Sequence, residues 1–211
     1  IITDPQNRRI GSIGQPAGEV EVKIGGNDEL LIKAAGCTPG YYNRPDKTAE
    51  LWQDGWLHTG DKVRIDDDGF IFITGRVKDY FKTIQGKFVA PPPIEGRFAD
   101  NPHSEQQCLL GRGYSKTVMV TVLNEPSRLL PKEEVEAAAL ATVESINADI
   151  EKHARIGAII FSQTPWTIEN EILTPTMKIR REQIENTFGE DAERLARDGA
   201  EQGAIQLHWF D

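Results

Sequence analysis

The chain has 211 residues, of which 38% are hydrophobic and 27% are charged. These proportions are ordinary for a globular protein and allow one large core or two smaller ones. The net charge is −9, and no stretch is basic enough to form a patch for a phosphate backbone, so nucleic acid is not an expected partner. No apolar run approaches the roughly 18 residues of a membrane helix, so we expect no transmembrane segment.

The two cysteines indicate a cellular compartment, and the first residues indicate that the chain is part of a longer protein. Cys37 and Cys108 lie far apart in unlike contexts, so we interpret them as free thiols of a reducing compartment, the cytoplasm. The chain begins IITDPQNRR, without a methionine or a targeting pattern. We therefore expect an internal cut in a longer protein.

Residues 1–77 are predicted to be rich in β-strands. Val20, Val22 and Ile24 alternate with Glu21 and Lys23, which is the period-2 pattern of a half-buried strand. The segment between Gly36 and Glu50 is mostly loop because of its glycines and prolines. Further strands are predicted over residues 29–34, 55–66 and 69–76, the last two joined by an acidic turn at 66–69, and a short helix over 48–52.

Residues 78–211 are predicted to be a smaller α/β unit, which makes the fold class α/β (α+β). KTVMVTVL at 116–123 and GAIIFS at 157–162 are typical of strands. Apolar residues spaced by three or four predict a helix over 131–155, and the charged tail from about Ile179 also favours a helix. The apolar face of the first helix comprises Val135, Ala139, Val143, Ile146 and Ile150.

Three motifs in order give the strongest indication of function. They are DGWLHTGD (54–61), GRVKDYFKTIQGKFVAPPPIE (75–95) and LTPTMKIRR (173–181). Together they resemble the C-terminal motifs of the adenylate-forming superfamily, which includes acyl-CoA synthetases, peptide-synthetase adenylation domains and luciferases, and GYYNRPDKTAE (40–50) also fits the family pattern. Within it, the second and third motifs look most like the long-chain fatty acyl-CoA synthetases. The resemblance implies that residues 1–77 end a large AMP-binding domain and that 78–211 form a mobile lid domain.

The chemistry of acid activation explains why such motifs hold charged residues. A carboxylate must attack a phosphorus that already carries negative charge, so the protein must neutralise charge around that centre. It must also hold the nucleotide in line. A lysine ammonium suits the first task, and a carboxylate that accepts hydrogen bonds from sugar hydroxyls suits the second.

Two residues are candidates for nucleotide binding. The resemblance implies that Asp61, expected at a strand end, binds both ribose hydroxyls of ATP. It implies that Arg76 reaches the nucleotide near the ribose and phosphates. The alternative for Asp61 is an ordinary turn residue. For Arg76 the alternative is a boundary arginine that pairs with a local acid such as Asp79.

Four residues at the start of the second unit have roles that the resemblance alone implies. Lys78 matches the hinge, whose φ and ψ absorb the rotation of the lid. Lys82, Gly86 and Lys87 match the segment that helps form the channel for the pantetheine arm of CoA, where a glycine allows close backbone approach. The alternative for all four is a strand and turn with solvated lysines.

Lys178 is the catalytic candidate. The resemblance implies that it contacts the acyl carboxylate and the α-phosphate during adenylation, with Thr174 and Thr176 in the loop that presents it. The alternative is a lysine at the entry of a helix, beside two arginines. One departure from the family text is Asn170-Glu171, where Asn-Gly is common.

The resemblance implies ATP, Mg²⁺ and CoA as cofactors and a fatty acid as substrate. The family's phosphate loop and its aromatic-Gly-x-Thr-Glu segment are missing, so we expect the Mg²⁺ contacts and most ATP contacts outside this chain. We expect no metal site within it: the aspartates at 66–68 favour an exposed turn, and His58 is expected to be structural. The chain alone is predicted to be inactive. Three alternatives stay open, namely aryl acids as substrates, a carrier-protein thiol as acceptor, and a non-catalytic binding module derived from the lid; nothing indicates an oligomeric state.

Overall fold

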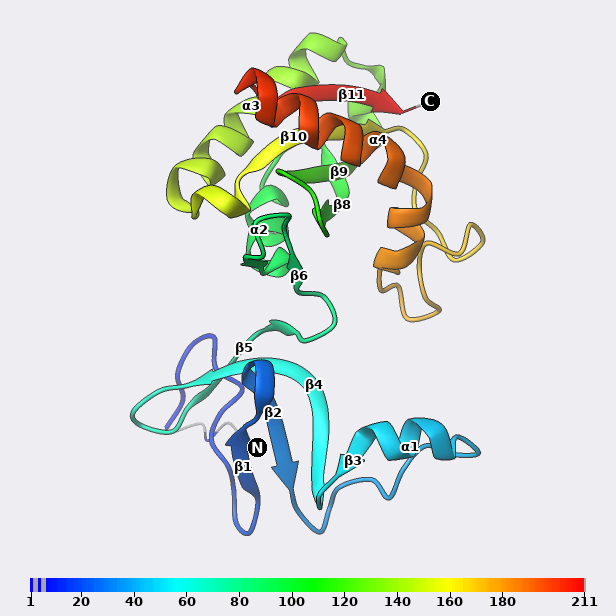
Figure 1. Ribbon diagram of the computed structural model, residues 1–211. Coiled ribbons are helices and arrows are strands. Elements are labelled where there is room, and N and C mark those ends of the chain that lie inside the picture. The colour runs from blue at the N-terminus through cyan, green and yellow to red at the C-terminus, as the bar shows by residue number, and fades with distance from the viewer. Residues whose placement is uncertain (2–3, 5–6, 211) are drawn as a thin grey trace. The chain divides into compact units, whose positions relative to one another are not determined.

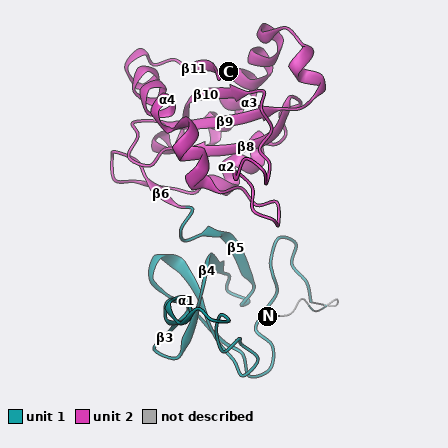
Figure 2. Ribbon diagram, turned by 90° about the vertical axis from the view of Figure 1, so that its right-hand side faces the viewer, with its two compact units in different colours: residues 1–79 teal, residues 80–211 magenta. Residues whose placement is uncertain are grey.

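The computed structural model describes residues 1, 4 and 7–210, and they form two compact units, 1–79 and 80–211 (Figure 2). The division lies two residues beyond the boundary expected from the sequence. Each unit has its own sheet and its own core. No helix in the described part of the chain is long and apolar enough to cross a membrane.

The first unit is built on a five-stranded antiparallel sheet of order β1-β2-β4-β3, with β5 paired to β4 (Figure 1). Leu30, Val63 and Ile71 form its small buried core. The strands confirm the predicted β-rich character. Their bounds are β1 Glu21–Ile24, β2 Glu29–Lys33, β3 Trp52–Gln53, β4 Trp56–Ile65 and β5 Ile71–Arg76, with a 3₁₀ turn at Gly26–Asp28.

Helix α1 spans Pro45–Leu51, so the predicted helix over 48–52 began too late. Pro45 is the first helical residue, where its fixed φ favours a helix and its missing N–H costs nothing. The acidic turn between β4 and β5 is confirmed. Asp66 accepts hydrogen bonds from the backbone of Phe70 and Asp68, and Arg9 pairs with both Asp66 and Asp68.

The second unit contains a four-stranded sheet of order β11-β10-β9-β8. Strands β9 and β11 run parallel to β10, whereas β8 is antiparallel to β9. Helices α2 and α3 pack on one face and α4 on the other, so β9 and β10 are buried along their whole length (Figures 1 and 2). The bounds are α2 Pro91–Phe98, β8 Ser104–Leu110, β9 Thr117–Leu123, α3 Lys132–Asp149, β10 Ile156–Ser162, α4 Arg181–Gln202 and β11 Gln206–Phe210.

The strands predicted over 116–123 and 157–162 are confirmed as β9 and β10, but the first long helix is shorter than predicted. α3 ends at Asp149 because Asn147 draws the chain back toward the sheet. The amide of Asn147 bonds both the N–H and the C=O of Ile156, at 2.8 and 2.9 Å. Residues 150–155 therefore leave the helix and pass through a short 3₁₀ turn at Lys152–Ala154.

The charged tail is helical only in part, so the prediction of a helix to the end was wrong. α4 ends at Gln202 and is capped by Gly203, whose φ of +69° is the left-handed conformation that terminates many helices. The chain then adds β11 to the edge of the sheet, where Trp209 stacks on Phe161 of β10 with ring centroids 4.8 Å apart. Strand β8, strand β11 and helix α2 were not predicted from the sequence.

Candidate functional site

Asp61 and Arg76 lie opposite each other on neighbouring strands. Asp61 is inside β4 and Arg76 is the last residue of β5, and the register makes them direct partners. The Nε of Arg76 donates to Oδ1 of Asp61 at 2.9 Å. The side chain of Arg76 is 54% exposed and that of Asp61 is 26% exposed, so both are accessible to solvent.

Two sequence-based expectations about this pair are corrected. Asp61 was expected at a strand end, but β4 continues to Ile65 with an irregularity of register between Lys62 and Val63. Asp79 was the expected alternative partner of Arg76, but it contacts Arg76 through the backbone, where the N–H of Asp79 donates to the carbonyl of Arg76 at 3.1 Å. The guanidinium pairs with Asp61 instead.

Glu29 holds the backbone next to Asp61, and sequence reasoning missed it. Its Oε1 accepts from the N–H of Gly60 at 2.8 Å and its Oε2 lies 2.9 Å from Nδ1 of His58. Gly60 has φ +73°, a conformation that favours glycine. The hydroxyl of Thr59 accepts from the N–H of Asp61 at 3.1 Å. His58 therefore has a structural contact, and the carboxylate of Glu29 fixes the bend that presents Asp61.

Lys78 lies in the exposed turn that follows β5. The N–H of Val77 donates to the carbonyl of Gly60 at 2.8 Å, which ties the start of this turn to β4. Lys78 is one residue from Asp79, the last residue of the first unit. Its place at the end of a unit is compatible with the hinge role that the motif predicts, which stays a prediction.

Lys82, Gly86 and Lys87 belong to one small hairpin, formed by β6 (Phe81–Lys82) and β7 (Phe88–Val89). Gly86 has φ +73° in its turn, and a Cβ there would meet nothing within 4 Å, so the glycine serves the backbone conformation. The Nζ of Lys82 lies 4.8 Å from the ring centroid of Phe88. Both lysines are exposed.

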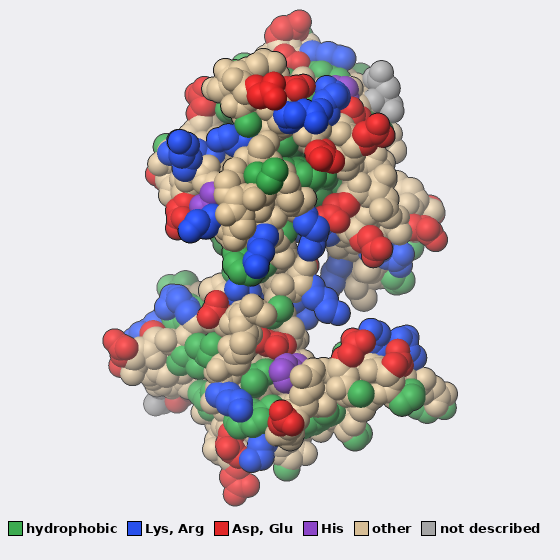
Figure 3. All heavy atoms as spheres, viewed as in Figure 1, with side chains coloured by type: hydrophobic (Ala, Val, Ile, Leu, Met, Phe, Trp, Pro, Cys, Tyr) green, Lys and Arg blue, Asp and Glu red, His purple; other side chains and the backbone are tan. Residues whose placement is uncertain are grey.

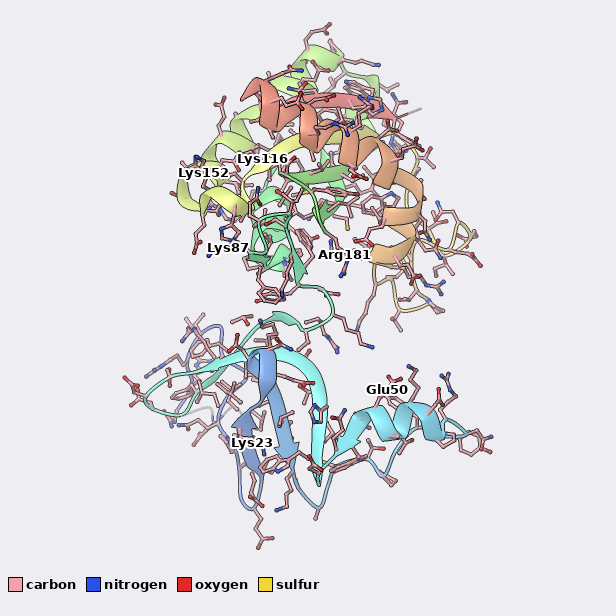
Figure 4. The ribbon with its side chains drawn as sticks, viewed as in Figure 1. Lys23, Glu50, Lys87, Lys116, Lys152 and Arg181 are labelled. Atoms are coloured by element: carbon pink, nitrogen blue, oxygen red, sulfur yellow. The ribbon has the colours of Figure 1, made fainter. Side chains whose placement is uncertain are left out.

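The turn end of this hairpin is attached to the segment between β8 and β9. The N–H of Ile84 donates to the carbonyl of Tyr114 at 3.0 Å, and the N–H of Gly113 donates to the carbonyl of Lys82 at 2.8 Å. These two backbone bonds hold the hairpin on the second unit, and Figure 4 labels Lys87 at its edge.

Lys178 is exposed and sits in a tight turn that precedes α4. The N–H of Thr174 donates to the carbonyl of Lys178 at 2.8 Å, and the N–H of Lys178 donates back to the hydroxyl of Thr174 at 3.0 Å. Met177 has φ +60°, a left-handed conformation that is costly for a residue with a side chain. The turn is therefore held in one shape by bonds within it.

The ends of this turn are joined to each other and to the core. Leu173 and Ile179 form an isolated antiparallel bridge, and the N–H of Arg180 donates to the carbonyl of Ile172 at 2.8 Å. Leu173 is 2% exposed, so it anchors one end in the core. α4 starts only at Arg181, so the helix predicted from about residue 179 begins later and Lys178 belongs to the turn.

The surface of the described residues offers few other candidates. Figure 3 shows acidic and basic side chains interspersed over the visible face. Among the residues that the structure describes, no group of three or more His, Cys, Asp and Glu side chains could hold a metal ion.

Comparison with known proteins identifies the family of the second unit. The family model described as "AMP-binding enzyme C-terminal domain" matches residues 78–198, which is more than half of the chain. The chain belongs to this family. It is thereby a member of the adenylate-forming superfamily, as the motifs indicated.

Two kinds of curated protein are similar in sequence to this chain. A long-chain-fatty-acid–CoA ligase of Mycobacterium tuberculosis is 28% identical over 204 residues, covering 89% of this chain and 34% of the relative. A carboxylic acid reductase of the same organism is 31% identical over 186 residues, covering 85% of this chain and 16% of the relative. The chain thus spans about a third or less of the length of these relatives.

Solved structures confirm the fold class. The adenylation domain of a carboxylate reductase from Mycobacterium chelonae aligns with a TM-score of 0.75 and 25% identity, over 89% of this chain and 32% of that one. The A-PCP didomain of a carboxylic acid reductase from Segniliparus rugosus, in complex with AMP, aligns with a TM-score of 0.74 and 26% identity, over 90% and 29%. The adenylation domains therefore share the mixed α/β architecture of this chain.

Proposed function

We propose that this chain is the C-terminal part of an ATP-dependent ligase that joins a fatty acid to CoA through an acyl-AMP intermediate. The observation that carries the proposal is the pairing of Asp61 with Arg76 in a family member that also displays Lys178 on a bonded turn. The curated fatty acid–CoA ligases among the relatives support the choice of acid and acceptor.

In the first half-reaction, a carboxylate oxygen of the fatty acid attacks the α-phosphorus of ATP and the bond to pyrophosphate breaks. Asp61 accepts hydrogen bonds from the ribose hydroxyls, since a carboxylate has several acceptor sites and one is used by Arg76. Arg76 keeps further N–H donors for phosphate oxygens. Lys178 supplies positive charge where negative charge accumulates at the phosphorus.

In the second half-reaction, the sulfur of CoA attacks the acyl carbonyl, the bond to AMP breaks and the thiol proton is lost. The β6–β7 hairpin would line the path of the pantetheine arm, with Gly86 allowing close approach of the backbone. Lys78 would act as the hinge between a large domain ending with residues 1–77 and a lid formed by 78–211. This division is part of the proposal.

The proposal assigns Mg²⁺ contacts to protein outside this chain. Bound Mg²⁺ would neutralise charge on the phosphates of ATP. Among the described residues, no group of three or more His, Cys, Asp and Glu side chains could hold a metal ion, which supports this assignment. Cys37 and Cys108 are not joined in a disulfide, which is compatible with a reducing compartment such as the cytoplasm.

A second candidate keeps the adenylation step and changes the acid or the acceptor. The relative with 31% identity is a carboxylic acid reductase, and one matched structure is an A-PCP didomain. An aryl acid, or a carrier-protein thiol in place of CoA, would therefore suit the same pair of units. A non-catalytic module derived from the lid is the third possibility that the test must separate.

The test uses the full-length protein that carries this chain and measures pyrophosphate release with ATP, Mg²⁺ and a panel of fatty and aryl acids. Lys178→Ala is expected to lower acid-dependent release by roughly a hundredfold or more, the scale of losing one preorganised charge-stabilising group. Lys152→Ala, which removes another exposed lysine of the second unit, is the matched control and should leave release unchanged.

Product analysis then separates the candidates. Fatty acyl-CoA as the main product supports the first proposal, whereas aryl-CoA or a loaded carrier protein supports the second. Wild-type release in Lys178→Ala would contradict the role of Lys178, and no acid-dependent release from the wild type with any acid would favour the non-catalytic module.

A further inference from the structure

A partly buried ion pair lies next to the turn that presents Lys178. Arg181, labelled in Figure 4, is the first residue of α4. Its side chain is only 17% exposed. Its Nη2 lies 2.8 Å from Oε1 of Glu95, which belongs to α2 and is also 17% exposed. Its Nη1 donates to the carbonyl of Leu109 at 2.6 Å and to Sγ of Cys108 at 3.0 Å.

Glu95 completes the connection between three elements. The same Oε1 that pairs with Arg181 accepts from the N–H of Leu109 at 2.7 Å. One guanidinium and one carboxylate therefore join α4, α2 and strand β8. Burial of such a pair costs desolvation, so it is weak as a source of stability, but its hydrogen bonds fix the relative position of the groups that they join. The planar fork of an arginine suits this role, and a lysine cannot reproduce it.

This connection holds the C-terminal end of the turn in position. The other end is anchored by buried Leu173, and the bonds between Thr174 and Lys178 keep the middle in shape. Only Ile179 and Arg180 lie between Lys178 and the guanidinium that is tied to the sheet. The position of Lys178 relative to the second unit therefore depends on where Arg181 is held.

We propose that Arg181 and Glu95 are positioning residues for Lys178, an inference that rests on the proposed function. Neither is assigned to substrate; they act through the backbone of the turn. A catalytic group must be held within about 0.5 Å of its productive place, and a misplacement of about 1 Å can cost a hundredfold in rate.

The first test follows the turn itself in the 211-residue chain by amide hydrogen exchange. Arg181→Lys keeps the positive charge but loses the planar guanidinium, whose N–H groups bond Glu95 and Leu109 at the same time. We expect the amides of Thr174, Lys178 and Arg180, which are bonded within the turn, to exchange about tenfold faster, while those of β9 and β10 keep their protection. Unchanged exchange of the turn amides would overturn the inference.

A matched control and a second variant accompany this test. Arg97→Lys alters an exposed arginine of α2 that pairs with Asp149 at 2.9 Å, and it should leave the turn unchanged. Glu95→Gln keeps the shape and an oxygen for Leu109 but weakens the attraction to Arg181, so it should also speed exchange of the turn. If both pair variants fail to fold while Arg97→Lys folds, the pair serves the whole fold and the positioning role is wrong.

The second test measures the half-reactions of the full-length protein. In Arg181→Lys, kcat for acid-dependent pyrophosphate release should fall about tenfold to a hundredfold. KM for ATP should be unchanged, because the proposed nucleotide contacts, Asp61 and Arg76, belong to the other unit. The rate of thioester formation from a supplied acyl-adenylate should also be unchanged. A fall in both half-reactions alike would overturn the positioning role.

Lys178→Ala separates failure of this inference from failure of the proposed function. If that variant releases pyrophosphate at the wild-type rate, the proposed role of Lys178 fails, and hydrogen exchange alone decides whether the pair orders the turn. If Lys178→Ala is impaired but Arg181→Lys is as active as the wild type, the proposed function stands and the positioning role is wrong.

Discussion

The guanidinium of Arg76 and the carboxylate of Asp61 meet across two antiparallel strands, with Nε 2.9 Å from Oδ1. The pairing of β4 with β5 brings them together, and the bend at Gly60, held by Glu29, turns the backbone beside them. Each group uses part of its hydrogen-bonding capacity in the pair and has further capacity for the nucleotide that we propose it binds. This relationship leads to the first prediction.

Asp61→Asn is expected to weaken nucleotide binding without unfolding the first unit. A hydrogen bond to a charged group contributes about 1.5–3 kcal/mol, so KM for ATP in the full-length protein should rise roughly tenfold to a hundredfold. The free energy of unfolding should change by less than about 1 kcal/mol, because the ion pair is partly exposed. Asp68→Asn, at the acidic turn, is the control; an unchanged KM in Asp61→Asn would contradict the nucleotide role.

Glu29→Ala should destabilise the first unit much more than loss of an exposed acid. The side chain of Glu29 is 14% exposed and serves both Gly60 and His58, so its removal leaves a backbone N–H and a ring nitrogen without their partner. We expect a loss of about 1–3 kcal/mol, measured by urea unfolding. Glu21→Ala, which removes an exposed partner of Lys33, should cost about 1 kcal/mol or less, and an equal effect of the two variants would contradict this prediction.

Asp66 is expected to make the stability of the first unit depend on pH at the acidic end. Burial raises the pKa of Asp66, but bonds from the N–H of Phe70 and from Arg9 outweigh it, and the pKa lies below its ordinary value of 3.8. A lowered folded-state pKa gives stability that is present above pH 3.8 and is lost as the pH falls through the folded-state value.

Asp66→Asn tests the predicted direction of this pH dependence. The variant should be less stable than the wild type at pH 7, and the difference should shrink as the pH falls below 3.8. Urea unfolding at a series of pH values measures the difference. A gap between wild type and variant that is constant across that range would show that Asp66 contributes no linked proton.

Trp209→Ala tests the contribution of the strand that sequence reasoning missed. Trp209 stacks on Phe161, donates from Nε1 to Glu136 at 2.6 Å and lies under the ammonium of Lys132. Loss of a half-buried aromatic of this kind should cost about 2 kcal/mol or more in the unfolding of the second unit. Trp52→Ala, in the other unit, should leave that transition in place; a loss near zero for Trp209→Ala would mean that β11 adds little.

Local patterns predicted most of the strands, and tertiary contacts explain the misses. β8 opens with the polar residues Ser104 to Gln107, and it is a strand because β9 supplies its hydrogen bonds. β11 follows a long charged helix, and its place is determined by pairing with β10. α3 stops at Asp149 because Asn147 bonds Ile156, a contact that no periodicity reveals.

Residue types at short spacing were enough to predict the β-rich first part and the α/β second part, and they also form the motifs that identify the family. Tertiary structure alone decided which of those residues meet. Asp61 joins Arg76 through strand register, and Glu95 joins Arg181 across 86 positions of the chain. Such long-range partners depend on the packing of whole elements, and packing follows from the total burial of many side chains, which a local pattern does not record.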